Sequence, residues 1–180
     1  MRRKPTWVVL FSAAIMATAF CYAVNVRATA ADKFKGVTLY HGRFGEIDVF
    51  NQFIPPKATD DEEQKRDMWL SWQETKGSSD LYVQQNIWAP QGSTGWHTHP
   101  GHSLIIVTAG TVTAYEGDDP DCKPSVYTKG MAFVDPGGDH VHIVRNEGAV
   151  EAQTIAVQLI PAGQPRRIDL IDPGNCPSDD

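Results

Sequence analysis

The feature that most constrains the fold of this 180-residue chain is a succession of short strand-like runs after residue 30. The runs are rich in β-branched and aromatic residues, and Gly, Pro or Asp separates them. They cover residues 37–40, 46–50, 68–75, 80–88, 104–108, 111–115, 125–128, 131–134, 141–145 and 152–159. No segment after residue 30 keeps the 3.6-residue apolar period of a helix. Short strands at roughly 8–12-residue spacing predict an all-β sandwich or barrel.

The first thirty residues differ in character from the rest. They contain four basic residues and no acidic one, and residues 7–24 form an uncharged, mainly apolar run. Ala28 and Ala30 then stand as the small residues of an A-x-A cleavage site. This order is typical of a secretory signal peptide, and we expect cleavage after Ala30. The alternative is an uncleaved membrane anchor, because spans begin at roughly 17 apolar residues.

The remaining chain is clearly acidic. Residues 31–180 contain 12 Lys and Arg against 22 Asp and Glu, a net charge of −10. A nucleic-acid-binding protein needs a basic face for phosphates, so that class of partner is excluded. We expect a secreted or periplasmic domain that meets a membrane only through an uncleaved leader.

Two cysteines, Cys122 and Cys176, lie beyond the leader. Export to an oxidising compartment favours a disulfide between them over two free thiols. Cys122 lies in a turn-like stretch and Cys176 near the C-terminus, so the bond would tether the tail to the body. Neither has an adjacent histidine or helix start that would lower the pKa of a reactive thiol.

The histidines are concentrated in one part of the chain. His97 and His99 are two residues apart, which places both side chains on one face of a strand, and His140 and His142 repeat this spacing. Two such strands in one barrel could converge on a divalent metal, which neutral imidazole binds at about 2.0–2.2 Å. The alternative is a set of hydrogen-bonding histidines that lines a dry or sugar-binding pocket.

The segments that contain these pairs resemble the two motifs of the cupin superfamily. GWHTHPGHSLIIVTAG, residues 95–110, is similar to the first motif, in which H-x-H precedes a Glu and a Gly. GMAFVDPGGDHVHIVRN, residues 130–146, is similar to the second, which ends in P-x-G, His and Asn. With the flanking strands, the resemblance covers roughly residues 68–162. It implies a single double-stranded β-helix, or jelly-roll, barrel but no particular reaction, because cupins include enzymes, storage proteins and binding domains.

The resemblance also implies metal ligands in the first motif. His97 and His99 match the first two, and Ser103 occupies the position of the family's glutamate. A neutral hydroxyl is a poor substitute for a carboxylate, so the resemblance implies a three-histidine site. Loss of a −1 ligand would leave more positive charge on the metal and favour an anionic or chelating substrate.

The second motif contains an irregularity. Its P-x-G element predicts a ligand at Val141, whereas Asn146 predicts one at His142, so one residue is inserted around 137–140. We assign His142, because a strand would place it beside the other ligands. His140 would share that face as a candidate fourth ligand, a partner of a ligand, or the general base.

Three neighbouring residues are expected to lie off the ligand face. His102 is one position out of register and is expected at the rim, and Arg145 alternates away from the ligands. Trp96 has the opposite parity to His97 and is expected to pack under a neighbouring strand.

These features predict a signal peptide (1–30), an N-terminal arm with strands and an acidic loop (31–67), a barrel (68–162) and a disulfide-tethered tail (163–180). We expect an exported protein that binds Fe, Mn or Zn through three histidines and acts as an oxygenase or lyase on a small organic molecule. The alternative is a non-catalytic protein that binds a small ligand or sugar at a degenerate metal site. Similar cupins are commonly dimeric, which makes a homodimer a candidate assembly, although no sequence feature marks its interface.

Overall fold

The computed structural model describes residues 28–54 and 68–176, and every regular element in these ranges is a strand. The all-β prediction is therefore confirmed. Most of the predicted signal peptide and the charged segment 55–67 lie outside the described residues. Within the described ranges, no helix is long and apolar enough to cross a membrane.

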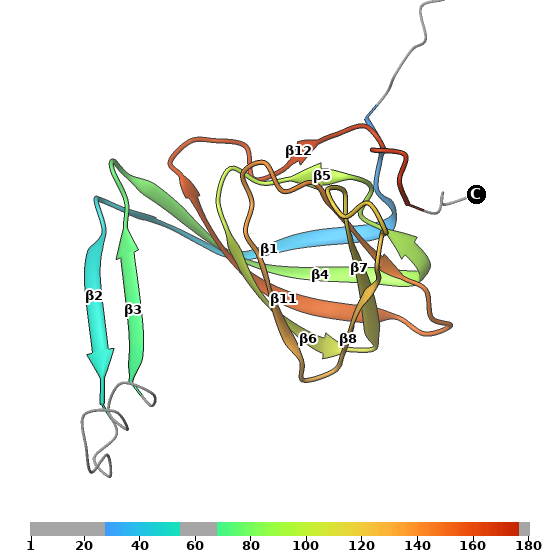
Figure 1. Cartoon of the computed structure of the whole chain (residues 1–180), viewed down its shortest axis with the longest axis horizontal. Coiled ribbons are helices and arrows are strands. Elements are labelled where there is room, and N and C mark those ends of the chain that lie inside the picture. The colour runs from blue at the N-terminus through green and yellow to red at the C-terminus, as the bar shows by residue number, and fades with distance from the viewer. Residues whose placement is uncertain (1–27, 55–67, 177–180) are drawn as a thin grey trace, which may run out of the picture.

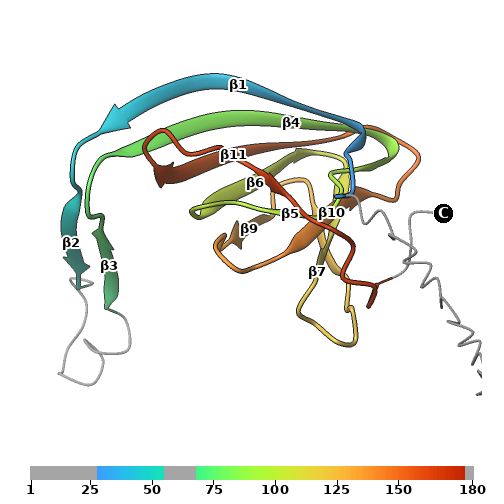
Figure 2. The same ribbon diagram turned by 90° about the horizontal axis from the view of Figure 1, so that it is seen from above.

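Ten of the strands form one strongly curved sheet that nearly closes into a barrel (Figure 1). They are β1 (Asp32–Phe44), β4 (Ser79–Ser93), β5 (His97–Thr98), β6 (Ser103–Ala109), β7 (Thr111–Glu116), β8 (Ser125–Thr128), β9 (Ala132–Asp135), β10 (His142–Asn146), β11 (Ala152–Pro161) and β12 (Ile168–Asp169). The long strand β4 pairs with β1 along one edge and with β11 along the other. In Figure 2 these three strands form one long curved layer above the shorter strands.

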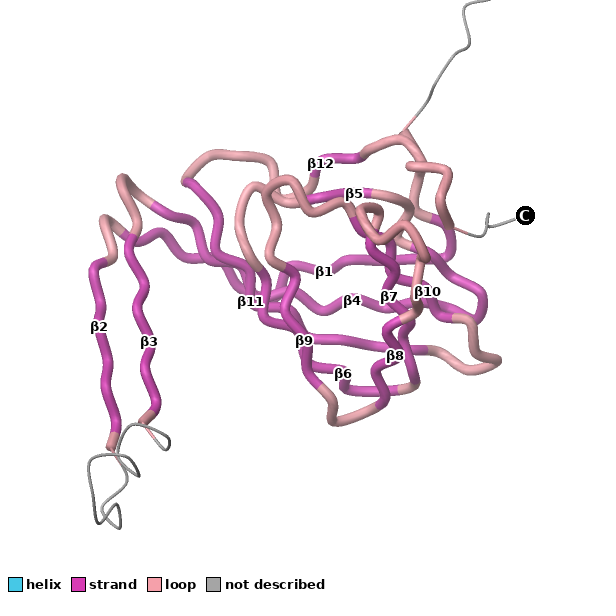
Figure 3. The backbone as a smooth tube through the Cα atoms, in the orientation of Figure 1, coloured by secondary structure: helices cyan, strands magenta, loops and turns pink. Residues whose placement is uncertain are grey.

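Two strands lie outside the barrel. β2 (Asp48–Phe53) and β3 (Trp69–Glu74) pair only with each other and project as an arm, seen in Figure 3. The structure thus divides the chain differently from the predicted boundary at residue 67, because β1 belongs to the barrel and residues 69–74 to the arm. Strand patterns could not reveal this, since the apolar side chains of the arm, such as Trp72 at 72% exposure, cover no core.

The alternation of buried and exposed residues along the barrel strands distinguishes an inner face from an outer face. In β11, every second residue from Ala152 to Ile160 is buried. In β6, Ser103 and Val107 are buried, whereas Leu104 and Ile106 between them are exposed. This two-residue period is what a sheet with one enclosed face produces, and it decides which side chains reach the interior.

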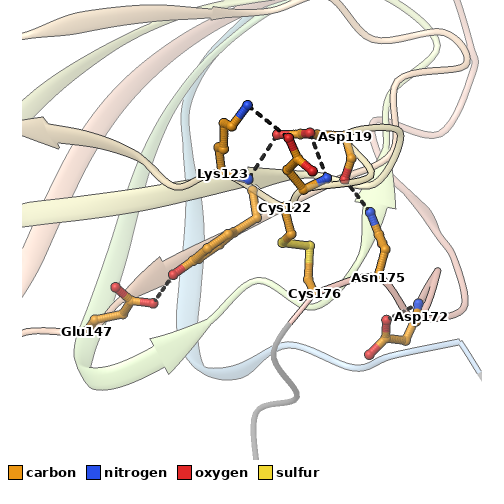
Figure 4. The surroundings of a disulfide bond; sticks show 10 residues. Asp119, Cys122, Lys123, Glu147, Asp172, Asn175 and Cys176 are labelled. Atoms are coloured by element: carbon orange, nitrogen blue, oxygen red, sulfur yellow. Dashed lines mark hydrogen bonds and ion pairs between the residues drawn. A yellow bond between two sulfur atoms is a disulfide. The ribbon is translucent and has the colours of Figure 1, made fainter.

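The C-terminal tail is fastened to the barrel at two places. β12 pairs with β5, and a Cys122–Cys176 disulfide joins the tail to the loop after β7 (Figure 4). The predicted disulfide is confirmed. Beside it, the Asn175 side chain donates a hydrogen bond of 2.6 Å to the carbonyl of Asp119. The tail is therefore part of the folded body.

The N-terminal end of the described chain also packs on the barrel. The backbone N–H of Thr29 donates to the carbonyl of Leu170 at 2.9 Å, and its hydroxyl accepts from the N–H of Trp96 at 2.6 Å. Gly95, at a φ of +67°, leaves the space for this approach, since a Cβ there would lie 2.7 Å from the Thr29 carbonyl oxygen. Cleavage after Ala30, as the leader pattern predicts, would remove these contacts.

Replacement of both Cys122 and Cys176 by Ser should lower the free energy of unfolding by about 4 kcal/mol. The bond spans 54 residues, and its loss frees the unfolded chain of that loop constraint. Urea denaturation of the wild type and the double variant measures the difference, which should vanish when both are measured in dithiothreitol. A difference below about 1 kcal/mol without reductant would contradict the prediction.

A chain that begins at residue 28 should be more stable than one that begins at residue 31. The three hydrogen bonds of Thr29 contribute about 2 kcal/mol together. Urea denaturation of the two chains tests this, and Thr29→Val in the longer chain serves as a matched variant with an intermediate effect. Equal midpoints for the two chains would show that the Thr29 contacts do not stabilise the barrel.

Candidate metal centre

Three histidines converge inside the barrel, in the wall of a cavity of about 230 Å³. His97 on β5 stands directly opposite His142 on β10, and His99 follows β5 by one residue. One ring nitrogen from each of the three lies within 4.8 Å of the others. The ring centroids of His97 and His142 are only 4.3 Å apart. The structure thus brings together the three residues that the sequence predicted.

Hydrogen bonds fix which ring nitrogen is free in two of these histidines. Nδ1 of His97 lies 2.9 Å from the carbonyl of Gly95, and Nδ1 of His99 is bonded to the carbonyl of Arg166. Because a carbonyl only accepts, Nδ1 must donate, and Nε2 of a neutral ring then presents its lone pair. Nδ1 of His142 is buried and has no hydrogen-bond partner among the described residues. Free imidazole nitrogens of this kind suit a transition metal.

Burial keeps the three rings neutral. Their side chains are largely removed from water, and this loss of solvation lowers the pKa of each ring, that of His142 to about 4. The positive charge of Arg167 lowers all three pKa values further. Since metal binding requires a deprotonated ligand nitrogen, the rings near neutral pH are ready to coordinate.

A buried carboxylate, Asp135, faces the histidines from the neighbouring strand. It is 5% exposed, ends β9, and lies opposite Ser103 on β6. One carboxylate oxygen lies 3.3 Å from Nε2 of His99 and accepts from the Ser103 hydroxyl at 3.3 Å. The other lies 3.7 Å from Nδ1 of His142 and accepts from the N–H of Gly137 at 2.9 Å.

Asp135 is not among the residues predicted from the sequence, because the predicted strand ends at residue 134 and a proline and two glycines follow Asp135. The signal in the sequence that could have identified it is its place one residue beyond an alternating run, and the structure pairs it with Ser103 on the non-consecutive strand β6.

His140 does not share the ligand face as expected. Its side chain is 47% exposed, and its Nδ1 lies 3.8 Å from a carboxylate oxygen of Asp118, in a separate group with Glu116. The physical reason is that β10 begins only at His142, and a turn precedes it. Strand alternation therefore does not extend back to residue 140.

The three residues expected off the ligand face are found there. His102 lies outside the central cavity, beside grooves near the base of the arm. Trp96 is 1% exposed and packs in a second core with Tyr115 and Ile143. The guanidinium of Arg145 lies 5.1 Å from the centre of the Tyr115 ring, away from the ligands.

Two arginines of the tail also line the cavity, and neither was predicted from the sequence. Arg166 is bonded to the Gln84 side chain and lies over the Tyr82 ring at 5.1 Å. Arg167 donates to the carbonyl of Thr94 at 2.5 Å. Counted as formal charges, these two arginines and Asp135 give the cavity lining +1 in an otherwise acidic chain, and Arg167 also pairs with Asp169 at its edge. A cavity of this charge attracts anions.

Residues 87–158 match the family of the cupin domain. These residues therefore form a cupin domain. The matched range contains the three histidines and Asp135, whereas Arg166 and Arg167 lie beyond it. Comparison with curated proteins found no match.

Among solved structures, this cupin is similar to peruvianin-I, a cysteine peptidase from Thevetia peruviana latex, with 26% identity over 51% of this chain and 56% of that one and a TM-score of 0.42. It is also similar to an oxalate oxidase in complex with glycolate, with 23% identity over 50% of this chain and 46% of that one and a TM-score of 0.43. A predicted oxalate decarboxylase from Thermotoga maritima has 17% identity over 47% of this chain and 83% of that one and a TM-score of 0.38. The cupin spans about half the length of the first two. These partial likenesses assign no activity to it.

Proposed function

We propose that this cupin binds a divalent transition metal through His97, His99 and His142 and acts as an oxygenase or lyase on a small anionic organic molecule. The observation that carries the proposal is the group of three neutral, largely buried imidazoles with ring nitrogens within 4.8 Å. Fe, Mn and Zn are the candidate ions. A bound ion would supply a Lewis acid and, for Fe or Mn, a redox centre.

The cavity itself supports a small anionic substrate. Arg166 and Arg167 supply two cationic groups that could hold a carboxylate by charge-assisted hydrogen bonds. Gln158, 4% exposed, also lines the cavity, and its Oε1 has no partner within the described structure. This oxygen is placed to accept a hydroxyl or amide hydrogen from a ligand, since buried acceptors are rarely left without a donor.

One observation favours a second candidate, a non-catalytic cupin that binds a sugar or similar polyol. One wall of the cavity is a chain of uncharged polar groups. The Gln84 amide donates to Asn86 at 2.6 Å, and Asn86 donates to the Thr154 hydroxyl at 3.3 Å. Amides and hydroxyls of this kind could pair with several hydroxyl groups of a ligand.

An exported location is part of the proposal. The disulfide between Cys122 and Cys176 supports an oxidising environment, because such bonds persist outside the cytosol. Together with the leader-like residues 1–30, it supports a secreted or periplasmic protein.

Replacement of His97, His99 or His142 by Ala should abolish stoichiometric metal binding, because each removes one of three nitrogen ligands. Elemental analysis of tag-free protein, reconstituted separately with Fe(II), Mn(II) and Zn(II), measures this. His102→Ala is the matched control and should bind like the wild type, since it lies outside the cavity. Less than about a tenth of an equivalent of metal in the wild type would overturn the metal proposal.

If the wild type binds metal, oxygen uptake and product analysis on small carboxylates would separate the two candidate functions, since binding without turnover favours the non-catalytic one.

Arg166→Gln and Arg167→Gln should each weaken carboxylate binding by roughly 10–100-fold, because each removes a charge-assisted hydrogen bond. Calorimetric titration of the metal-loaded protein with malonate measures the effect, and the neutral analogue malonamide should be unaffected. His99 keeps its partner in Arg166→Gln, since that partner is a backbone carbonyl. Lys129→Gln, at an exposed turn, is the control. Equal losses for malonate and malonamide would show that the arginines only maintain the cavity's shape.

A further inference from the structure

Asp135 is the one carboxylate among the described residues that line the central cavity. Its two oxygens face His99 and His142, and Ser103 lies opposite it in the position of the family's glutamate. We propose that Asp135 is the fourth protein ligand of the metal and that it replaces, from β9, the carboxylate missing from β6. This inference rests on the proposed function and extends it.

The first argument is which ring nitrogen of His99 is free to coordinate. Its Nδ1 is bonded to the carbonyl of Arg166, so Nε2 is the ring nitrogen left to coordinate an ion, and it lies 3.3 Å from a carboxylate oxygen of Asp135. An imidazole nitrogen and a carboxylate oxygen are both ligand atoms that a transition metal accepts. A cation between them would be bound by both groups.

The second argument is the spacing of the two atoms. Ligands that are both about 2.1 Å from one ion, at tetrahedral or octahedral angles, lie roughly 3.0–3.4 Å from each other. The observed distance of 3.3 Å between the Asp135 oxygen and Nε2 of His99 falls in that range. The pair is therefore spaced as two ligands of one ion would be.

A role for Asp135 that only orients His99 fits the geometry less well. A carboxylate that orients a metal-bound histidine accepts a hydrogen bond from the ring nitrogen that does not touch the metal. In His99 that nitrogen is Nδ1, and the carbonyl of Arg166 already serves it. Asp135 instead faces the edge of the ring that would coordinate.

The sheet explains how a carboxylate on β9 could serve in place of one on β6. Ser103 and Asp135 are direct partners in the β6–β9 ladder, and such partners carry their side chains on the same face about 4.5–5.5 Å apart. The short Ser103 side chain leaves room for Asp135 and donates a hydrogen bond to it. The N–H of Gly137 holds its other oxygen. A carboxylate on either strand could thus reach the same ion, and the −1 charge returns to a site that the sequence predicted to lack it.

The test is titration of tag-free protein with Co(II) against a competing chelator, with the visible spectrum recorded at saturation. Asp135→Asn should weaken binding by at least about 100-fold, beyond the roughly 10–100-fold typical of residues that only support a ligand. Its saturated spectrum should also differ from the wild type, because one ligand is lost. The exchange variant Ser103→Glu with Asp135→Ser should bind within about 10-fold of the wild type, because it returns the carboxylate to β6.

Asp139→Asn is the matched control, since Asp139 is an exposed acid in the turn after β9 and should have no effect. Circular dichroism of each metal-free variant confirms that it is folded. The role of Asp135 would be overturned, and the proposed function kept, if the wild type binds Co(II) and Asp135→Asn binds it within about threefold as tightly. The same conclusion would follow if Asp135→Asn shows the wild-type spectrum at saturation. A wild type that takes up no metal would overturn the proposed function itself.

Discussion

The site depends on the position of β5, a strand of only two residues. β5 pairs with β10 on one edge, which sets His97 opposite His142, and with β12 of the tail on the other. The tail is held by the disulfide, and its Arg166 carbonyl receives the Nδ1 hydrogen of His99. A strand this short has little pairing energy of its own. The tail, beyond the matched cupin range, therefore holds two of the three imidazoles in place.

The sequence predicted the parts of the molecule that follow from local periodicity. Strand alternation and the H-x-H spacing identify the barrel, His97 and His99, and the Asn146 register identifies His142. The same rule fails at His140, because it assumes a strand where the chain turns. Asp135, Arg166 and Arg167 could not be predicted in this way, because cross-strand pairing and the return of the tail bring them to the cavity. Residues that only tertiary contacts bring together do not form a periodic pattern in the sequence.

Charge is distributed unevenly between the surface and the cavity. Residues 31–180 have a net charge of −10, whereas two arginines and one carboxylate leave the cavity at +1. Burial and the field of Arg167 keep the histidines neutral, so an incoming cation meets free nitrogens and a carboxylate. The acidic surface draws cations toward the protein, and the arginines bind anions once these reach the interior. This separation suits a centre that must bind a metal and an anion together.

The cavity wall indicates that the interior is built for a ligand, because polar groups there are left incompletely paired. A barrel selected for stability alone would fill this space with apolar side chains, since a buried polar atom without a partner costs about 1–3 kcal/mol. Here Nδ1 of His142 and Oε1 of Gln158 remain without partners among the described residues. A bound metal and substrate would supply the missing partners. The free energy of unfolding should therefore rise when the centre is loaded, because the ligands bind only the folded barrel.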